Sequence, residues 1–322
     1  LSGSYFDQSG IIIENYLRRF NTRLNLDHQV NSHLSYGSTL SMTRSINKRS
    51  FNDNTYTGVL TNALGASPLM PVYDKDGSYA QSGNYQVNWL SDNPVKSAKE
   101  VSAFTNTDRL IGSVYSEYKF TPALKLRTTW SLDYTNSKDS QYFSPLTVDA
   151  QAVGGKIYYS SFNNMTWLNE NILSYQKQLN PDNYIEALGG VTRQQSTSDQ
   201  ISIRGQGLPT TGGLKTISAA AIINNSSEIP SSWYLTSFLS RVNYRFKNKF
   251  LASFSFRADA SSRFPTNKRV GYFPSASIGY NLAEESFLKD GNVFDALKFR
   301  VSYGLTGDQE IGNFQAISYW RP

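Results

Sequence analysis

The chain has 322 residues, with 31 Lys and Arg against 25 Asp and Glu, a formal net charge of +6 and no Cys. The absence of Cys excludes a disulfide framework and a thiolate metal site, and the mild, evenly scattered positive charge does not predict a nucleic-acid-binding surface. No apolar run approaches the ~18 residues that a transmembrane helix needs.

The main pattern along the chain is an alternation of apolar and polar residues, which predicts strands with one apolar face. The first clear strand carries Phe20, Leu24 and Leu26 on one face, and the chain returns after a short turn at 31–33. Four later connections also contain residues that hairpin turns favour: 121–123, 180–183, 247–249 and a longer link near 283–287. The sequence therefore predicts an all-β, antiparallel fold.

The two faces of these strands differ in polarity. The side chains expected to point outward are apolar, namely Trp130, Val242, Phe254, Phe256 and Ile278, whereas Arg257 and Arg300 are expected to point inward. An apolar outside and a charged inside are typical of a transmembrane β-barrel. For the hairpin that turns at 180–183 the facing stays open, because two outward sets fit: Trp167, Leu173 and Tyr175, or Leu168 and Ile172.

The other ends of the hairpins are much longer. Segments 46–107, 136–163 and 195–233 are rich in Gly, Ser, Asn and Thr and are expected to be loops, with a short helix near 56–64 in the first. Short turns at one end and long loops at the other are the pattern of an outer-membrane barrel. A soluble β-sandwich or β-helix fits this asymmetry less well.

Candidate metal and catalytic sites are weak throughout. His28 and His33 lie five residues apart across a turn, with no third ligand to complete a zinc site. The segment 74–77, Asp-Lys-Asp-Gly, opens like a calcium loop but lacks the rest of that signature, so a hairpin turn is the better interpretation. No catalytic, cofactor-binding or metal-binding residue is predicted, and the chain is not expected to be an enzyme.

Two groups of residues are candidates for substrate binding. Tyr79, Tyr85 and Trp89 lie in the long segment 46–107, where flat rings suit a sugar or a peptide; packing within the segment is the alternative. The inward-facing arginines could attract a polar substrate or pair with neighbouring carboxylates. This second group comprises Arg19, Arg23, Arg127, Arg241, Arg257 and Arg300.

Four phrases in the last quarter of the chain have the order and spacing of a known family. They are Arg-Ala-Asp-Ala-Ser-Ser-Arg-Phe at 257–264, Gly-Tyr-Phe-Pro-Ser at 271–275, Glu-Glu-Ser-Phe-Leu at 284–288 and Val-Ser-Tyr-Gly-Leu-Thr-Gly-Asp-Gln-Glu-Ile-Gly-Asn-Phe at 301–314. With these phrases the chain resembles the SusC/RagA family of TonB-dependent outer-membrane transporters. The resemblance implies an internal fragment of an antiparallel transmembrane β-barrel, roughly the middle half of 22 strands. Residues 1–322 would then be a partial barrel domain, with the plug domain and the C-terminal strands outside this chain.

The resemblance also implies a function and partners. The expected activity is TonB-dependent active import of oligosaccharides or peptides across the outer membrane of a Gram-negative bacterium. The implied partners are a SusD-like surface lipoprotein, TonB through the absent plug segment, the substrate and the lipid bilayer, with no nucleic acid and no cofactor. A passive porin or adhesin barrel, and a soluble glycan-binding β-protein, remain as alternatives.

Overall fold

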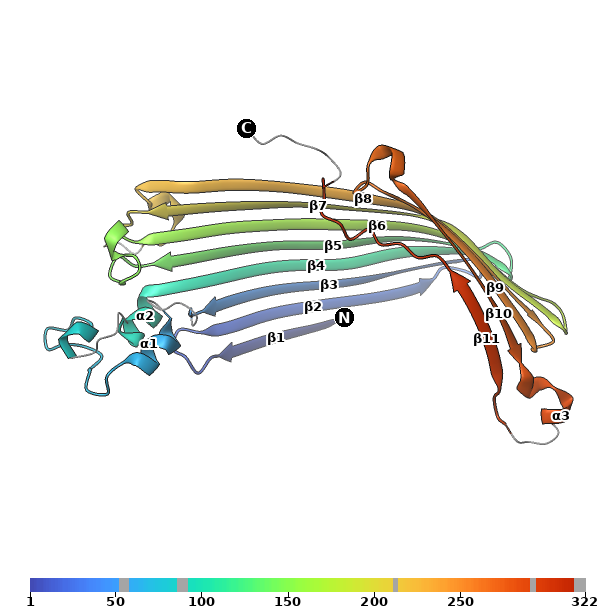
Figure 1. Ribbon diagram of the computed structural model, residues 1–322, viewed down its shortest axis with the longest axis horizontal. Coiled ribbons are helices and arrows are strands. Elements are labelled where there is room, and N and C mark those ends of the chain that lie inside the picture. The colour runs from blue at the N-terminus through green and yellow to red at the C-terminus, as the bar shows by residue number, and fades with distance from the viewer. Residues whose placement is uncertain (52–57, 86–91, 211–213, 290–293, 316–322) are drawn as a thin grey trace.

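The computed structural model describes residues 1–51, 58–85, 92–210, 214–289 and 294–315. In these described ranges, eleven antiparallel strands form one sheet in chain order (Figure 1). They are β1 (Ser2–Ser9), β2 (Tyr16–Gln29), β3 (Leu34–Arg49), β4 (Val101–Lys119), β5 (Leu124–Phe143), β6 (Lys156–Asn180), β7 (Asn183–Gln206), β8 (Ile222–Phe246), β9 (Phe250–Ser261), β10 (Val270–Asn281) and β11 (Lys298–Gly304). The helices are short: α1 (Val59–Gly65), α2 (Pro94–Glu100) and α3 (Ser286–Lys289). Among the described residues, no helix has the length and apolar character needed to cross a membrane.

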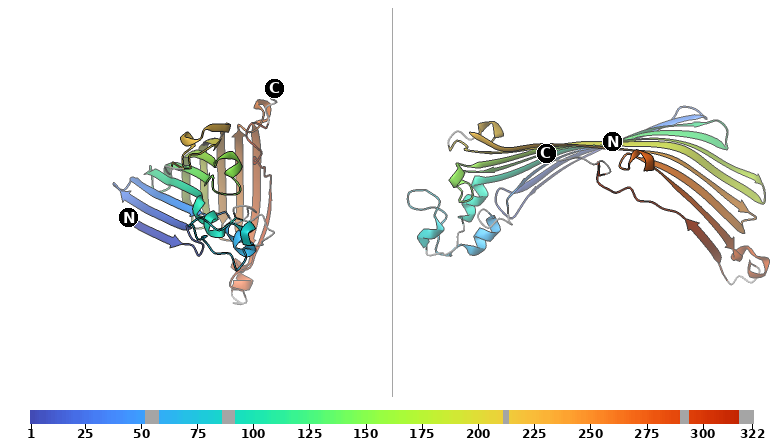
Figure 2. Two further views of the ribbon diagram at one scale, coloured as in Figure 1. Left: turned by 90° about the vertical axis from the view of Figure 1, so that its left-hand side faces the viewer. Right: turned by 45° about the horizontal axis from the view of Figure 1, so that its top comes forward.

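The sheet is an open, strongly curved meander. Within the described ranges β1 pairs with β2 alone and β11 with β10 alone, so both edge strands leave one side unpaired. Figure 2 shows the sheet arched, with the helical segment that contains α1 and α2 beneath the arch. The predicted all-β, antiparallel architecture is confirmed, although these strands alone do not close into a barrel. Unpaired edge groups would be costly in lipid, so the edges require further strands there.

The short connections lie together at one end of the sheet, because alternate connections of an antiparallel meander share an end (Figure 1). In the turn between β2 and β3, Asn31 Oδ1 accepts hydrogen bonds from the backbone N–H groups of His33 (2.8 Å) and Leu34 (2.9 Å). Between β8 and β9, Lys247 and Asn248 have φ values of 49° and 55°. Two successive positive φ values match the right-handed twist of the flanking strands. The predicted turns are therefore confirmed.

The opposite connections are shorter than the sequence predicts, and this expectation was wrong. The strands run on to leave only 50–100, 144–155 and 207–221 between them, and β6 and β8 reach 25 residues each. Beyond the apolar band both faces of these strands are polar, so the alternation that identifies a strand disappears from the sequence. The same loss explains why β1 was missed, since neither face of its sequence Ser-Gly-Ser-Tyr-Phe-Asp-Gln-Ser is consistently apolar.

Strand register assigns every side chain to one of two faces, because paired residues point to the same side of a sheet. Val242 pairs with Phe254, and Phe254 with Ala276, along the apolar face. Phe254, Ile278 and Val301 on this face are 52%, 68% and 70% exposed. Arg257 and Arg300 lie on the opposite face, as predicted. On that face Phe51 from the segment after β3 stacks on Phe143, with ring centroids 5.3 Å apart, so the polar face is the concave one.

The hairpin of β6 and β7, whose facing the sequence left open, now has a defined orientation. Leu168 pairs with Gln194, and Ile172 pairs with Arg127, so both leucine and isoleucine lie on the polar face. Trp167 lies on the apolar face, where its ring centroid is 5.8 Å from that of Trp130. Of the two outward sets, the one with Trp167, Leu173 and Tyr175 is therefore correct.

The apolar face is about one bilayer tall. β9 and β10 have 12 residues each, close to the roughly 9–11 residues with which a tilted strand crosses a membrane. On the longer strands the same face becomes polar after this height, in a row of paired residues that includes Asp108, Asn136, Asn163 and Asp199. β5 to β8 therefore combine an apolar stretch about one bilayer tall with a polar extension beyond it.

Candidate functional site

The described residues of the segment 58–100, namely 58–85 and 92–100, form a small folded unit next to the far ends of β3 and β4. Asn93 organises it: its side-chain oxygen accepts hydrogen bonds from the backbone N–H groups of Val95 (3.0 Å) and Lys96 (3.3 Å), which caps α2. Its amide nitrogen donates to the carbonyl oxygens of Val72 (3.0 Å) and Ala80 (3.2 Å). One side chain thus joins the helix to the preceding loop, and Pro94 at the first helical position favours the same start.

A buried ion pair fixes this unit to the neighbouring connection. Lys96 Nζ lies 2.6 Å from Asp92 Oδ1, and the two side chains are only 10% and 4% exposed. Asp92 Oδ1 also accepts a hydrogen bond from the backbone N–H of Asn93 (2.9 Å), and Oδ2 accepts one from that of Val148 (3.2 Å). Because Val148 belongs to the β5–β6 connection, Asp92 links two connections at the same end of the sheet.

The predicted aromatic residues contact their own segment. Tyr79 is half-buried against Tyr73, with ring centroids 5.2 Å apart, and burial is the main cause that raises the pKa of its phenol. The Tyr85 hydroxyl donates to Asp74 Oδ1 at 2.5 Å, and this hydrogen bond raises the Tyr85 pKa. Trp89 lies outside the described residues. The rings of Tyr79 and Tyr85 are therefore partly used in packing, while part of each ring stays accessible.

The turn at 74–77 has hairpin geometry, as predicted. The backbone N–H of Asp74 donates to the Ser78 carbonyl (2.8 Å), that of Gly77 donates back to the Asp74 carbonyl (2.9 Å), and Gly77 has a φ of 84°. Among the described residues no group of three or more His, Cys, Asp or Glu side chains could hold a metal ion. His33 instead donates from Nδ1 to the Lys119 carbonyl oxygen at 2.8 Å, which ties two neighbouring turns together.

The polar face of β7 to β11 holds a cationic cavity of about 600 Å³ near the short turns. Its charged lining residues are Arg241, Arg245, Lys298, Arg300 and Glu186, so four cations surround one carboxylate. Arg245 lies over the Tyr184 ring, 4.6 Å from its centroid, and Glu186 accepts a hydrogen bond from Gln176 (3.0 Å). Arg300 has no hydrogen-bond or ion-pair partner within the described ranges. This cavity can attract a carboxylate or another anionic group.

A second cavity of about 800 Å³ lies further along the same face, toward the long connections. Arg257 and Asp259 line it, and Arg257 Nε lies 2.7 Å and 2.8 Å from the two oxygens of the Asp259 carboxylate. Arg257 also donates to Ser237 Oγ at 3.0 Å. Pairing with a neighbouring carboxylate is thus the arrangement of Arg257, but Arg300 remains available for another anion.

Comparison with known proteins decides between the classes of β-protein that this two-faced sheet allows. No family model matches the chain. TonB-dependent receptor P3 of Formosa agariphila is 30% identical over 329 residues, which cover 99% of this chain and 32% of that protein. TonB-dependent receptor SusC of Bacteroides thetaiotaomicron is 29% identical over 349 residues, covering 97% of this chain and 32% of that protein. The chain belongs to the SusC-type TonB-dependent receptors.

Solved structures agree on the fold of this SusC-type chain. The RagAB peptide importer in its open-open state superposes with a TM-score of 0.80 at 23% sequence identity, covering 96% of this chain and 35% of that one. The chain spans about a third of the length of the curated relatives that it matches. The family resemblance predicted from the phrases at 257–264 and 301–314 is confirmed.

In the SusC-type chain the two predicted groups of site residues lie far apart along the strands. All six predicted arginines lie on the polar face, with Arg19 and Arg23 on β2, whereas Tyr79 and Tyr85 belong to the folded unit beyond the sheet. Sequence reasoning did not include Arg245 or Lys298 among the substrate-binding candidates, although both stand at alternate positions on predicted strands. It also missed the pair Asp92–Lys96, for which the i, i+4 spacing on either side of Asn93-Pro94 was an available signal.

Proposed function

We propose that this chain is part of the barrel wall of a TonB-dependent importer in the outer membrane of a Gram-negative bacterium. The observation that carries the proposal is the two-faced sheet: an exposed apolar face one bilayer tall and a concave polar face with an unpaired arginine. Similarity to TonB-dependent receptors over 99% and 97% of the chain supports it. The parent protein would supply the plug domain, the TonB-contacting segment and the closing strands.

The rival functions fit less well. A soluble glycan-binding protein would expose a large apolar surface to water, with Phe254, Ile278 and Val301 side by side on neighbouring strands, which soluble monomers avoid. A passive porin or adhesin has the same strand pattern. The argument against it is the similarity of the chain to TonB-dependent receptors. The proposed activity performs no chemistry on the substrate.

The proposed substrate is an oligosaccharide or a peptide. The cationic cavity with Arg241, Arg245 and Arg300 favours a substrate that carries carboxylates, such as an acidic peptide or a uronic-acid-containing sugar. Tyr79 and Tyr85 would offer ring faces to the same molecule above the barrel mouth. The RagAB structures with the same fold are described as a peptide transporter and importer, which supports a peptide as one of the two classes.

Uptake by cells tests this proposal. Cells that carry the parent receptor are expected to accumulate labelled peptides or oligosaccharides, and accumulation is expected to stop when TonB is deleted or the proton gradient is dissipated. Uptake that continues without TonB would identify a passive pore. If neither labelled class enters the cells, the proposed substrate classes are wrong.

A surface lipoprotein of the SusD type is the proposed partner, and the unit 58–100 is its proposed contact. Leu64 at the end of α1 and Leu69 just after it are 83% and 84% exposed, although they are large apolar residues. Buried apolar anchors of this kind contribute much of the energy of an interface. Changing both to Asp (Leu64→Asp, Leu69→Asp) is expected to reduce co-purification of the lipoprotein at least tenfold.

The control for this experiment is Lys75→Glu, because Lys75 is exposed on the hairpin turn of the same unit and changes its charge without removing an apolar anchor. Both variants should insert into the membrane normally, since none of the three residues belongs to the sheet. Equal recovery of the lipoprotein with the double leucine variant and with the parent would remove these leucines from the interface.

Labelling of lysines on intact cells tests the proposed orientation. Lys75 in the unit 58–100 and Lys247 in the β8–β9 turn are both exposed and lie at opposite ends of the sheet. A membrane-impermeant amine reagent is expected to modify Lys75 and to leave Lys247 unmodified until the outer membrane is opened. Modification of both residues in intact cells would contradict the orientation.

A further inference from the structure

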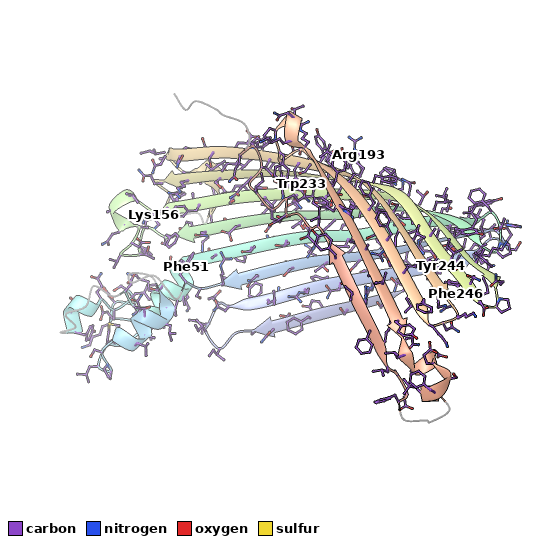
Figure 3. The ribbon with its side chains drawn as sticks, turned by 45° about the vertical axis from the view of Figure 1, so that its right-hand side comes forward. Phe51, Lys156, Arg193, Trp233, Tyr244 and Phe246 are labelled. Atoms are coloured by element: carbon purple, nitrogen blue, oxygen red, sulfur yellow. The ribbon has the colours of Figure 1, made fainter. Side chains whose placement is uncertain are left out.

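One guanidinium on the apolar face of the sheet has no protein partner. Arg193 is the next outward-facing residue after Val191 on β7, and its side chain is exposed (Figure 3). Strand register pairs it with Asn169 on β6 and Thr236 on β8, which are both uncharged. Within the part of the chain that the structure describes, Arg193 makes no hydrogen bond, ion pair or ring contact. An unpaired charge on a lipid-facing surface is costly and calls for a partner.

The height of Arg193 on the sheet follows from β9 and β10. Thr236 pairs with Ala260, and Ala260 with Val270, which is the first residue of β10. This row therefore lies at the end of the span of about one bilayer that β9 and β10 define, away from the short turns. On β6 the apolar face continues past Asn169 with Trp167 and Met165, so Arg193 lies just inside the boundary. A long arginine side chain can reach the headgroup region from there.

A second guanidinium reaches the same place. Tyr234 pairs with Gln195, the next outward residue after Arg193, so Arg193 and Tyr234 are diagonal neighbours about 7–8 Å apart at Cα. Arg269, in the β9–β10 connection, donates from Nη1 to the Tyr234 hydroxyl (3.0 Å) and from Nε to the Phe264 carbonyl (3.2 Å). Its remaining Nη group has no hydrogen-bond acceptor among the described residues. Arg269 also lines the second cavity on the polar face, and its Nη1 group reaches the outward-facing Tyr234 ring at the end of the β9–β10 hairpin. Arg193 and Arg269 therefore both lie next to Tyr234.

The charge distribution on this face indicates what binds there. The next carboxylate on the outward side of β7 is Asp199, six residues and about 20 Å along the strand. Asp259, nearer in sequence to Arg269, is on the polar face and bound by Arg257. A second copy of the chain would bring the same surface, and the described residues paired in the same row, Trp130, Asn169 and Thr236, carry no carboxylate. The neighbouring Asn169 already has its own partners, since it accepts a hydrogen bond from Asn171 at 2.7 Å and donates one to the Thr129 carbonyl oxygen at 3.2 Å.

We infer that Arg193 and Arg269 bind the phosphate of a lipid headgroup in the outer leaflet. A guanidinium presents two parallel N–H groups to phosphate oxygens, and the bilayer supplies phosphates at this height without help from another protein chain. The Tyr234 hydroxyl holds Arg269 in place and is a further hydrogen-bonding group beside the two cations. This inference rests on the proposed outer-membrane location, which assigns this boundary to the outer leaflet.

Binding of lipid A by the purified parent receptor tests the inference. The receptor is delipidated in a nonionic detergent and titrated with lipid A, with the same lipid A after phosphatase treatment, and with inorganic phosphate. The parent is expected to prefer phosphorylated over dephosphorylated lipid A, and Arg193→Gln to weaken binding of the phosphorylated form about tenfold, with Arg193→Lys closer to the parent. The matched control is Arg44→Gln, because Arg44 also lies on the outward side but already faces Asp108 at 3.8 Å.

Each other outcome overturns the inference. Equal affinity of the parent and Arg193→Gln for lipid A, or equal binding of both forms of lipid A, would show that Arg193 does not recognise a lipid phosphate. Equal affinity for inorganic phosphate and for lipid A would identify a free anion site. A change from dimer to monomer in Arg193→Gln on sedimentation would identify a contact between copies. Recovery of the receptor in the outer-membrane fraction reports separately on the proposed function.

Discussion

Asp92→Ala is expected to unfold the unit 58–100 locally, at a cost of about 3–5 kcal/mol. The substitution leaves the Lys96 ammonium buried without its carboxylate, 2.6 Å from where Asp92 Oδ1 now lies, and it removes the acceptor for the Val148 backbone N–H. Hydrogen exchange of the α2 amides in the parent receptor measures the effect, because local unfolding exposes them without unfolding the sheet.

Two variants sharpen this experiment. Lys99→Ala removes an exposed lysine from the same helix and should change exchange little. The double variant Asp92→Ala with Lys96→Met removes both charges and should recover most of the lost protection, since replacing a buried pair by apolar residues is often neutral. If the single and double variants exchange equally fast, the buried charge is not the cause of the loss.

Val242→Arg is expected to destabilise the membrane-inserted barrel by about 2–4 kcal/mol, the cost of an arginine on the lipid face near the midplane. Val242 pairs with Phe254, the fifth residue of the 12-residue strand β9, so it lies near the middle of the span. Urea titration of the parent receptor in lipid vesicles measures the change in free energy of unfolding.

The control places the same arginine on the other face. Ser277 lies on the polar face, pairs with Ser253 and Ser302, and lines the cationic cavity. Ser277→Arg adds a fifth cation to this wet cavity, where water weakens the repulsion between like charges, and should cost about 1 kcal/mol. Equal destabilisation by both variants would contradict the assignment of the two faces.

The sequence predicts the part of the fold with an apolar face well, for a physical reason. From Phe250 to Phe256 and from Ala276 to Tyr280 one face of the strand is apolar and the other is polar, so the sequence alternates with a period of two. The short turns are equally predictable from the sequence. Asn31 accepts a backbone hydrogen bond within its turn, and Asn248 adopts the positive φ that its turn requires.

The extensions beyond the apolar band are less predictable. There β6 and β7 carry polar residues on both faces, as at Asn163 and Asn164, so a strand reads like a loop. For this reason the loops predicted at 136–163 and 195–233 were too long: their ends are strand residues in the structure. β6 also places Leu168 and Ile172 on the polar face, which gave two opposite readings of its facing until pairing with β5 and β7 fixed the register.

The sequence predicts which types of residue form the candidate site, but it does not predict their contacts. The inward arginines follow from alternation, yet their partners come from neighbouring strands: Ser237 on β8 for Arg257, and the Arg245–Tyr184 contact beside the unpaired Arg300. In the unit 58–100 the fold depends on contacts such as that between Asp92 and Val148, 56 residues apart, which no local pattern reveals. Arg193 was visible as an interruption of the apolar alternation after Val191.

Cysteine accessibility along β9 tests the central claim most directly, namely that one face of this sheet contacts lipid and the other lines a water-filled lumen. The chain has no Cys, so single cysteines can be placed in turn at the successive residues Ala252, Ser253, Phe254, Ser255 and Phe256. In the membrane-inserted parent receptor, a water-soluble maleimide is expected to label the cysteines at Ser253 and Ser255, and a lipid-dissolved maleimide those at Ala252, Phe254 and Phe256. Uniform labelling of all five positions by the water-soluble reagent, or the reversed alternation, would contradict the account.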